Sequence, residues 1–131
     1  ARGHVNTSVW GFLQTSAAIK RKAAGVVIDG AVRDSMEIRE SGLPVFCRGV
    51  SPAGPHKGWK DDINTMTSCG GVVINPGDYI KGDDDGVVVV PKKDIEKVIK
   101  LSRERLEKEK EWFRKLDQGM NTFDIVGLSD E

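Results

Sequence analysis

The sequence predicts an α/β fold, and three observations lead to this prediction. A short β-branched run at residues 26–28 follows directly after a predicted helix and is bounded by glycines at Gly25 and Gly30. Further apolar runs bounded by glycine or proline follow along the chain, and a long charged segment begins after Pro91. A buried strand that comes straight after a helix is typical of proteins in which the two element types alternate.

The first half of the chain is predicted to alternate helix and strand. Residues 8–24 form the first helix, because residues 6–8 are all suitable N-caps and Gly25 is a natural C-terminal stop. An α/β chain normally begins its sheet with a strand, but the first predicted element here is a helix. The apolar face of this helix therefore has few strands to pack against. The elements that follow are a strand over 26–32, a short helix over 35–41 closed by Gly42, and a strand over 44–50.

The second half is predicted to hold a loop, short strands and a long helix. Prolines and glycines predict the loop over residues 51–62. The next elements are a strand over 71–74, a turn over 75–78 and a hairpin that joins 79–81 to 87–90. A charged helix over residues 92–118 completes a single domain that spans residues 1–131. Its solvated face is supported by the pairs Glu96/Lys100, Glu104/Lys108 and Glu111/Lys115.

Composition and charge exclude several classes of function. The chain has 131 residues, and its 20 Lys plus Arg balance 20 Asp plus Glu to give a formal net charge of zero. A neutral chain has little attraction for a phosphate backbone, so we expect no nucleic-acid partner. No apolar run approaches the roughly 18 residues of a membrane span, so we expect no membrane partner. Cys47 and Cys69 are predicted to be unpaired thiols and residues 1–4 lack a signal-peptide plan, so we expect a cytoplasmic protein.

The main candidate for chemistry follows the 26–32 strand, at Arg33, Asp34 and Glu37. The side chains of Arg33 and Asp34 would point to opposite faces of a strand, but where the chain turns both can converge on one ligand. Arginine supplies a fixed cationic fork for a carboxylate, and aspartate is a hard oxygen ligand for Mg²⁺ or Mn²⁺. Glu37 is placed to orient Arg33 or a metal-bound water. The same residues also fit a surface cluster of ion pairs, and their spacing leaves that alternative open.

The second candidate is the start of the first helix, at residues 10–14. Free backbone N–H groups and the helix dipole favour a carboxylate there, and Gly11 permits its close approach. Every helix has such an N-terminus, so this feature alone does not identify a binding site.

The acidic run at residues 83–85 is a third candidate. Three adjacent carboxylates suggest calcium, but an EF-hand loop needs alternating ligands and a distant glutamate. A tight Asp-Gly hairpin turn is therefore the favoured interpretation. His4 and His56 have no Cys, His or acidic partner at catalytic spacing, so neither is predicted to act in catalysis.

Four segments of the chain resemble one known family. In chain order they are Gly-Val-Val-Ile-Asp-Gly-Ala-Val-Arg-Asp at 25–34, Leu-Pro-Val-Phe at 43–46, Pro-Gly-Asp at 76–78 and Asp-Asp-Asp-Gly-Val-Val-Val-Val-Pro at 83–91. They resemble the RraA-like family from about Trp10 to Pro91, and the expected C-terminal helix follows. The family includes class II 4-hydroxy-4-methyl-2-oxoglutarate / 4-carboxy-4-hydroxy-2-oxoadipate aldolases, the ribonuclease E regulator, and members labelled demethylmenaquinone methyltransferases.

The resemblance implies a fold, an assembly and a site. The implied fold is a β/β/α swivelling-domain sandwich, like that of phosphohistidine domains, which forms homotrimers or hexamers with sites between subunits. The resemblance implies that Arg33 binds the pyruvyl group of the substrate and that Asp34 anchors Mg²⁺ or Mn²⁺. It also implies that the amides of Leu13 and Gln14 hold the substrate carboxylate. Glu37 matches the acidic position of the family motif.

The implied reaction is metal-dependent cleavage of a small 4-hydroxy-2-oxo acid to pyruvate and a second carbonyl product. Decarboxylation of oxaloacetate passes through the same pyruvate enolate and is the expected side activity. The alternative is a non-enzymatic, protein-binding regulator of RNA processing with a relict pocket. A phosphohistidine carrier would need a nucleophilic histidine in a suitable loop, so it is the least favoured hypothesis.

The sequence departs from the family pattern in two places. Family aldolases usually carry an acidic residue directly after the helix-start glycine, where this chain has Phe12. A metal is therefore expected to rest on Asp34 and on the substrate's own oxygens. The family domain also has a segment before the first helix, so either this chain is a fragment or the missing strands lie in another chain. We expect a homo-oligomer rather than a free monomer, with the site where subunits meet.

Overall fold

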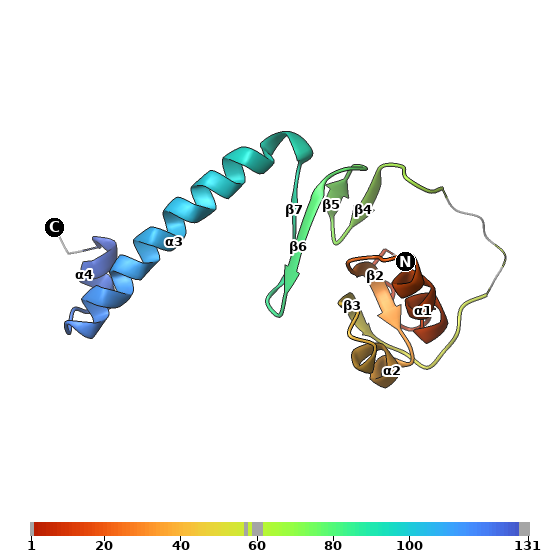
Figure 1. Ribbon diagram of the computed structural model, residues 1–131. Coiled ribbons are helices and arrows are strands. Elements are labelled where there is room, and N and C mark those ends of the chain that lie inside the picture. Colours follow the sequence, from red (N-terminus) through yellow and green to blue (C-terminus); the bar gives the residue numbers. More distant parts are fainter. Residues whose placement is uncertain (1, 57, 59–61, 129–131) are drawn as a thin grey trace. The chain divides into compact units, whose positions relative to one another are not determined.

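A computed structural model of the chain describes residues 2–56, 58 and 62–128. The chain divides into two compact units, Ala1–Pro91 and Lys92–Glu131 (Figure 1). The first unit mixes helices and strands, and the second is helical. The α/β class predicted from the sequence is confirmed, whereas a single domain over residues 1–131 stays a prediction.

The N-terminal unit is built around a three-stranded parallel sheet (Figure 1). Its strands lie in the order β1 (Ser8–Trp10), β2 (Val26–Val32) and β3 (Val45–Val50), and both neighbouring pairs are parallel. Helix α1 (Phe12–Lys20) connects β1 to β2, helix α2 (Ser35–Glu40) connects β2 to β3, and the two helices contact each other. Because the three strands are parallel, their carboxyl ends lie at one edge of the sheet.

The buried core of this unit lies at the carboxyl end of β2. Ala31 and Val32 are 0% and 3% exposed, and Ile38 of α2 is 5% exposed. Val27, nearer the other end of β2, is more than a third exposed. The best-packed part of the sheet therefore lies directly before Arg33 and Asp34.

Strand β1 corrects the prediction of a helix from residue 8. The N–H and the hydroxyl of Ser8 donate to the carbonyl of Ala53 at 2.8 and 2.7 Å, and β1 pairs with β2. Ser8, one of the residues that resemble N-caps, thus pairs within the sheet and bonds to a loop far along the chain. The helix begins only at Phe12. The sheet does begin with a strand, contrary to the prediction.

Helix α1 also ends before the predicted stop at Gly25. Its last residue is Lys20, and Lys22 adopts a left-handed conformation with φ 58°. The N–H of Lys22 donates to the Ile19 carbonyl at 2.9 Å, and that of Ala23 donates to the Ala18 carbonyl at 3.0 Å. These two bonds form a Schellman motif. Lys22 occupies the position that glycine usually takes, so the sequence does not indicate that the helix ends here.

Two antiparallel hairpins follow among the described residues of the N-terminal unit. They pair β4 (Thr67–Cys69) with β5 (Val72–Ile74), and β6 (Tyr79–Asp83) with β7 (Gly86–Val90). The predicted hairpin is confirmed, but its turn is residues 84–85 and not the predicted Asp-Gly pair, because Gly86 already pairs with Asp83. The Asp83 carboxylate accepts a hydrogen bond from the Asp85 N–H at 3.1 Å. Strand β4 is a new element that the sequence prediction lacked.

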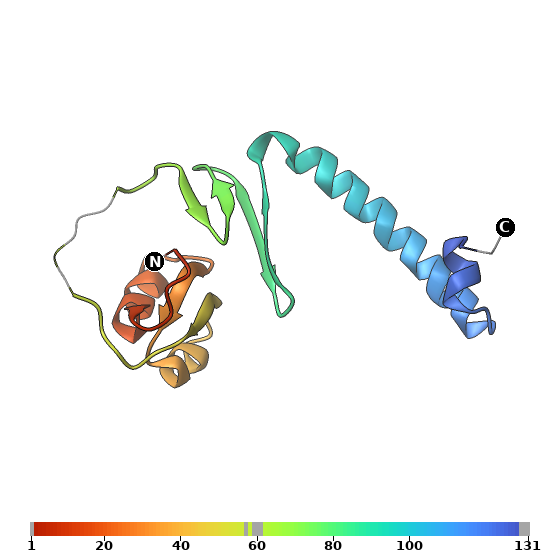
Figure 2. The same cartoon turned by 180° about the vertical axis from the view of Figure 1, so that it is seen from behind.

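The described part of the C-terminal unit, residues 92–128, contains two helices and a short 3-10 turn (Figure 2). The turn η1 (Lys92–Asp94) leads into α3 (Ile95–Asp117), and α4 (Thr122–Val126) folds back on α3 through the buried Ile125. The predicted long helix is therefore confirmed. Within the described ranges, no helix is both long and apolar enough to cross a membrane.

Ion pairs on α3 differ in part from the predicted ones. The pair Lys115–Glu111 is present at 3.1 Å, as predicted. Lys100 lies 4.0 Å from Glu104 instead of pairing with Glu96, which corrects the prediction. Lys108, the predicted partner of Glu104, lies over the Trp112 ring at 5.3 Å from its centroid. The aromatic ring supplies a second partner for a cation, which a count of charge spacings does not include.

Candidate functional site

The predicted site residues gather at the carboxyl edge of the parallel sheet. Gly11 follows β1, Arg33 and Asp34 follow β2, and the segment 51–54 follows β3. Hydrogen bonds tie these segments together, because the Arg33 N–H donates to the Trp10 carbonyl at 2.9 Å and the Ser51 N–H donates to the Val32 carbonyl at 2.9 Å. Ligands of open α/β sheets bind in the crevice outside this edge.

The Asp34 carboxylate links the end of β2 to the start of α1. Its Oδ2 accepts a hydrogen bond from the Phe12 N–H at 3.0 Å and lies 3.7 Å from Arg33 Nε. The free N–H groups and the positive dipole end of a helix stabilise a carboxylate. The backbone of Asp34 is left-handed, with φ 55°, a conformation that costs energy for any residue with a Cβ. The position of this carboxylate beside Arg33 thus involves a strained backbone conformation at Asp34.

Gly11 allows this close arrangement. A Cβ at Gly11 would lie 2.8 Å from Asp34 Oδ2 and 3.1 Å from both Cγ and Nε of Arg33. Any side chain at position 11 would therefore displace both residues. The group that approaches Gly11 in this structure is the chain's own Asp34, and a ligand carboxylate there stays a prediction.

The amides of Leu13 and Gln14 belong to the first turn of α1. Groups in a first turn have no acceptor four residues earlier within the helix, whereas the Phe12 N–H is already bonded to Asp34. A ligand carboxylate on the Leu13 and Gln14 amides would therefore share the helix start with the Asp34 carboxylate. Two negative groups at one helix end repel each other, so such a complex needs cationic charge between them.

Arg33 supplies one such cation. Its side chain is 41% exposed, and the 3.7 Å separation from Asp34 is longer than a hydrogen bond. Its guanidinium makes no hydrogen bond within the described part of the chain, so its donors are available to a carboxylate or a 2-oxo group. Glu37 is exposed on α2 and forms no ion pair with Arg33 among the described residues. Its orienting role stays a prediction.

Asp34 is the predicted metal ligand, and the residues around it determine what kind of metal site it can form. Among the residues that the structure describes, no three His, Cys, Asp or Glu side chains form a group that could hold a metal ion. Mg²⁺ is commonly held by one or two carboxylates while it keeps waters or substrate oxygens. Asp34 therefore fits a weakly held divalent cation that water and substrate complete. The described residues around it do not form a cage made only of protein ligands.

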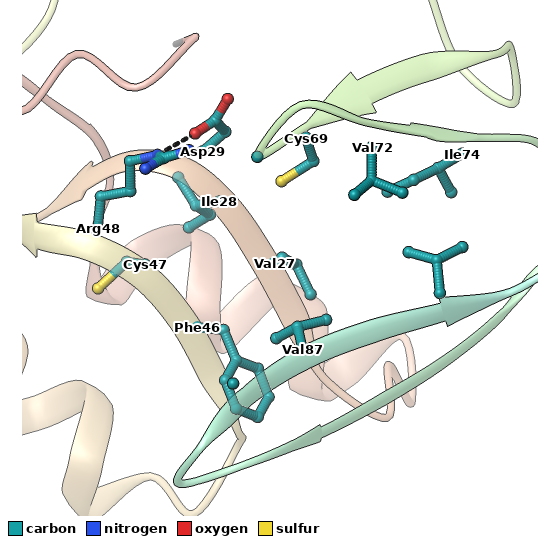
Figure 3. A pocket seen from close by; sticks show the side chains of 13 residues that line it. Val27, Ile28, Asp29, Phe46, Cys47, Arg48, Cys69, Val72, Ile74 and Val87 are labelled. Carbon is teal, nitrogen blue, oxygen red and sulfur yellow. Dashed lines mark hydrogen bonds and ion pairs between the residues drawn. The ribbon is translucent and has the colours of Figure 1, made fainter.

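A separate cavity of about 380 Å³ is lined by none of the predicted site residues (Figure 3). Val27, Phe46 and Val87 form part of its apolar wall, and Asp29 and Arg48 form an ion pair at one end. The hydrogen bond from Arg48 lowers the pKa of Asp29 below its ordinary value. Sequence reasoning missed this pair, although a charged residue within each of two β-branched strands is a signal that could have found it.

Cys69 of β4 and Cys47 of β3 both line this cavity, and both are free thiols, as predicted. Burial raises the pKa of the Cys69 thiol, and the nearby Asp29 carboxylate acts in the same direction. A raised pKa keeps a thiol protonated and unreactive near neutral pH. Cys69 therefore contributes packing to this cavity rather than a nucleophile.

Comparison with known proteins decides the family. A family model described as Aldolase/RraA matches residues 1–89 of the chain. The chain belongs to the RraA-like family. The family predicted from four sequence segments is thereby confirmed.

Relatives of this RraA-like chain extend the comparison. An uncharacterised protein of Methanocaldococcus jannaschii is 35% identical over 126 residues, which are 96% of this chain and 61% of that protein. The 4-hydroxy-4-methyl-2-oxoglutarate aldolase of Thermus thermophilus is 30% identical over 89 residues, which are 68% of this chain and 54% of that protein. The chain therefore spans between about half and three-fifths of the length of these relatives.

A solved structure is similar as well. The RNA-processing inhibitor RraA from Thermus matches with a TM-score of 0.63 at 30% identity, over 69% of this chain and 55% of that one. This likeness agrees with the α/β fold class. The RraA-like relatives thus include proteins named as an aldolase and as an inhibitor of RNA processing.

Proposed function

We propose that this RraA-like chain carries the site of a divalent-metal-dependent aldolase. Its substrate would be a small 4-hydroxy-2-oxo acid, and its products pyruvate and a second carbonyl compound. The observation that supports this proposal most is the Asp34 carboxylate held on the Phe12 N–H, beside the exposed guanidinium of Arg33. The name of the Thermus thermophilus relative supports the reaction class.

Three groups of the chain would share the binding of the substrate. Arg33 binds the pyruvyl part, because its planar fork matches two adjacent oxygens. The first-turn amides of Leu13 and Gln14 hold the carboxylate at the positive end of α1. Asp34 holds Mg²⁺ or Mn²⁺, and the bound ion supplies Lewis-acid polarisation of the 2-oxo group.

Cleavage then needs a sink for negative charge. The C4 hydroxyl loses its proton to water, and the electron pair of the C3–C4 bond moves toward the 2-oxo group. C4 becomes the carbonyl of the second product, and the pyruvyl fragment leaves as an enolate. Arg33 stabilises the charge that develops on the enolate oxygen. Protonation at C3 gives pyruvate. Oxaloacetate would lose carbon dioxide through the same enolate.

Apolar side chains around the site suggest that a second copy of the chain covers it. Leu13 is 79% exposed, Met36 64% and Val50 58%. Exposed apolar residues grouped near a functional site commonly mark an interface. We propose a homo-oligomer with this edge of the sheet at the subunit contact. Light scattering that finds a stable monomer at micromolar concentration would contradict it.

The proposed reaction can be tested by pyruvate release. The substrate is 4-hydroxy-4-methyl-2-oxoglutarate, supplied with Mg²⁺ or with a chelator. We expect release only with Mg²⁺, and we expect Arg33→Lys and Asp34→Asn to lose it. Glu40→Gln, which alters an exposed residue at the end of α2, is the matched control and should keep full activity. No pyruvate under either condition would contradict the aldolase and favour the non-enzymatic regulator.

A further inference from the structure

The loop after β3 is fixed to the sheet by two buried serines. Ser51, 7% exposed, donates its N–H to the Val32 carbonyl at 2.9 Å and its hydroxyl to the Asn6 carbonyl at 2.8 Å. Ser8, fully buried, donates both its N–H and its hydroxyl to the Ala53 carbonyl. Buried polar groups that are fully bonded hold the backbone in one place, because breaking them leaves unpaired groups in the interior.

Gly54 follows this fixed segment and lies against Arg33. A Cβ at Gly54 would be 2.9 Å from Arg33 Nη1, closer than side chains normally approach. The backbone of Gly54 is not left-handed, so its own conformation does not require glycine. A side chain at position 54 would instead meet the guanidinium where it now lies. A Cβ at Gly11 would likewise lie 3.1 Å from Arg33 Nε, so glycine backbone flanks the arginine at two points.

We infer that Gly54 is a positioning residue for Arg33. The serines prevent the loop from moving away, so a side chain at position 54 would displace the flexible end of the arginine instead. Such a displacement costs little folding stability, because a guanidinium that is 41% exposed can turn toward solvent. It does cost the fixed orientation in which the fork meets two oxygens together. This consequence for binding rests on the proposed function, whereas the position of the arginine does not.

The test compares Gly54→Ala with Gly49→Ala. Gly49 is the matched control, because a Cβ there would meet only Val5, at an ordinary 3.7 Å. The first measurement is the NMR resonance of the Arg33 Nε–Hε group, identified by its loss in Arg33→Lys. We expect Gly54→Ala to shift this resonance and Gly49→Ala to leave it in place, with both variants unfolding within a few degrees of the parent. An unshifted Arg33 resonance in Gly54→Ala would overturn the inference.

The second measurement is calorimetric binding of oxalate, a compact stand-in for the pyruvate enolate, in the presence of Mg²⁺. We expect binding about tenfold weaker in Gly54→Ala and unchanged in Gly49→Ala. Adding Gly54→Ala to Arg33→Lys should weaken binding no further, because the displaced group is already gone. Equal oxalate affinity in the parent and Gly54→Ala overturns the positioning role and leaves the proposed function standing. If the parent itself binds no oxalate, the proposed function fails, and the Arg33 resonance alone decides the inference.

Discussion

The two compact units of the chain are stabilised by different kinds of contact. In the N-terminal unit, apolar and polar side chains are buried side by side, and nearly all of them lie next to the site. They are Ala31, Val32 and Ile38, with Ser8, Thr15 and Ser51. In the C-terminal unit, Ile125 is the one buried apolar side chain among the described residues, and ion pairs line the surface of α3.

This difference shows which parts of the molecule depend on contacts between residues far apart in the sequence. The helix α3 follows from local propensity and from pairs three or four residues apart. The site depends instead on contacts between distant segments, such as the bond from Phe12 to Asp34. Thr15 adds a further brace, because its hydroxyl accepts from Trp10 Nε1 at 2.8 Å and donates to the Gly11 carbonyl at 3.1 Å. Substitutions of the buried residues of the N-terminal unit should therefore affect both activity and stability, and those on the exposed surface of α3 should affect neither strongly.

The largest contrast should come from removing one charge in each unit. Asp34→Asn keeps an oxygen that can accept the Phe12 N–H, so the fold should persist. Without the carboxylate, Mg²⁺-dependent pyruvate release should fall by about a hundredfold or more. Glu104→Gln on α3 is the control and should leave turnover unchanged. Turnover by Asp34→Asn equal to that of the parent, at saturating Mg²⁺, would show that Asp34 is not the metal ligand.

A second contrast concerns packing. Ile38→Ala empties a site that is 5% exposed, so it should lower the free energy of unfolding by roughly 2–5 kcal/mol. Ile99→Ala on α3, where the residue is 44% exposed, should change that free energy by less than about 1 kcal/mol. Urea unfolding of both variants measures the difference. Equal losses would mean that the helix face of α3 is buried as deeply as the sheet core.

A third prediction concerns Phe12, at the start of α1. Phe12→Asp places a second carboxylate near Asp34. Its attraction for a divalent cation at about 5 Å in water is roughly 1.7 kcal/mol, which corresponds to Mg²⁺ binding tighter by nearly twentyfold at most. Without Mg²⁺ the two carboxylates repel each other, so the variant should gain more thermal stability from Mg²⁺ than the parent does. Identical Mg²⁺-induced shifts in the melting temperature would contradict a metal at this helix start.

The smallest effect should come from the Asp29–Arg48 pair, and it depends on pH. The pKa of Asp29 is lowered in the folded state from an ordinary 3.8, mainly by the hydrogen bond from Arg48. The pair therefore stabilises the fold above that ordinary value, and the contribution is lost as pH falls through the lowered pKa. Arg48→Gln should melt a few degrees below the parent at pH 6, and the gap should close in strong acid. Arg103→Gln on α3 is the control and should show no such pH dependence.

Local signals in the sequence predicted most of the elements but not the contacts between them. The strand 26–32, the hairpin after Asp78 and the long charged helix each carry their own pattern of residues. Strands β1 and β4 are three residues each and lack such a pattern, because pairing with distant segments decides them. The turn at Arg33 and Asp34 was predictable from the end of an apolar strand. The hydrogen bond from the Phe12 amide to the Asp34 carboxylate joins residues 22 positions apart, and no local signal reveals it.

The most direct test of the account is calorimetric titration of Mg²⁺ into the chain with and without oxalate. If Asp34 supplies the one protein carboxylate of the site, Mg²⁺ should bind weakly to the free chain. Oxalate should then tighten Mg²⁺ binding by supplying oxygens, and Mg²⁺ should tighten oxalate binding by the same factor. Asp34→Asn should abolish this coupling. An Mg²⁺ affinity that oxalate leaves unchanged would contradict a site for a metal and a 2-oxo acid at Arg33 and Asp34.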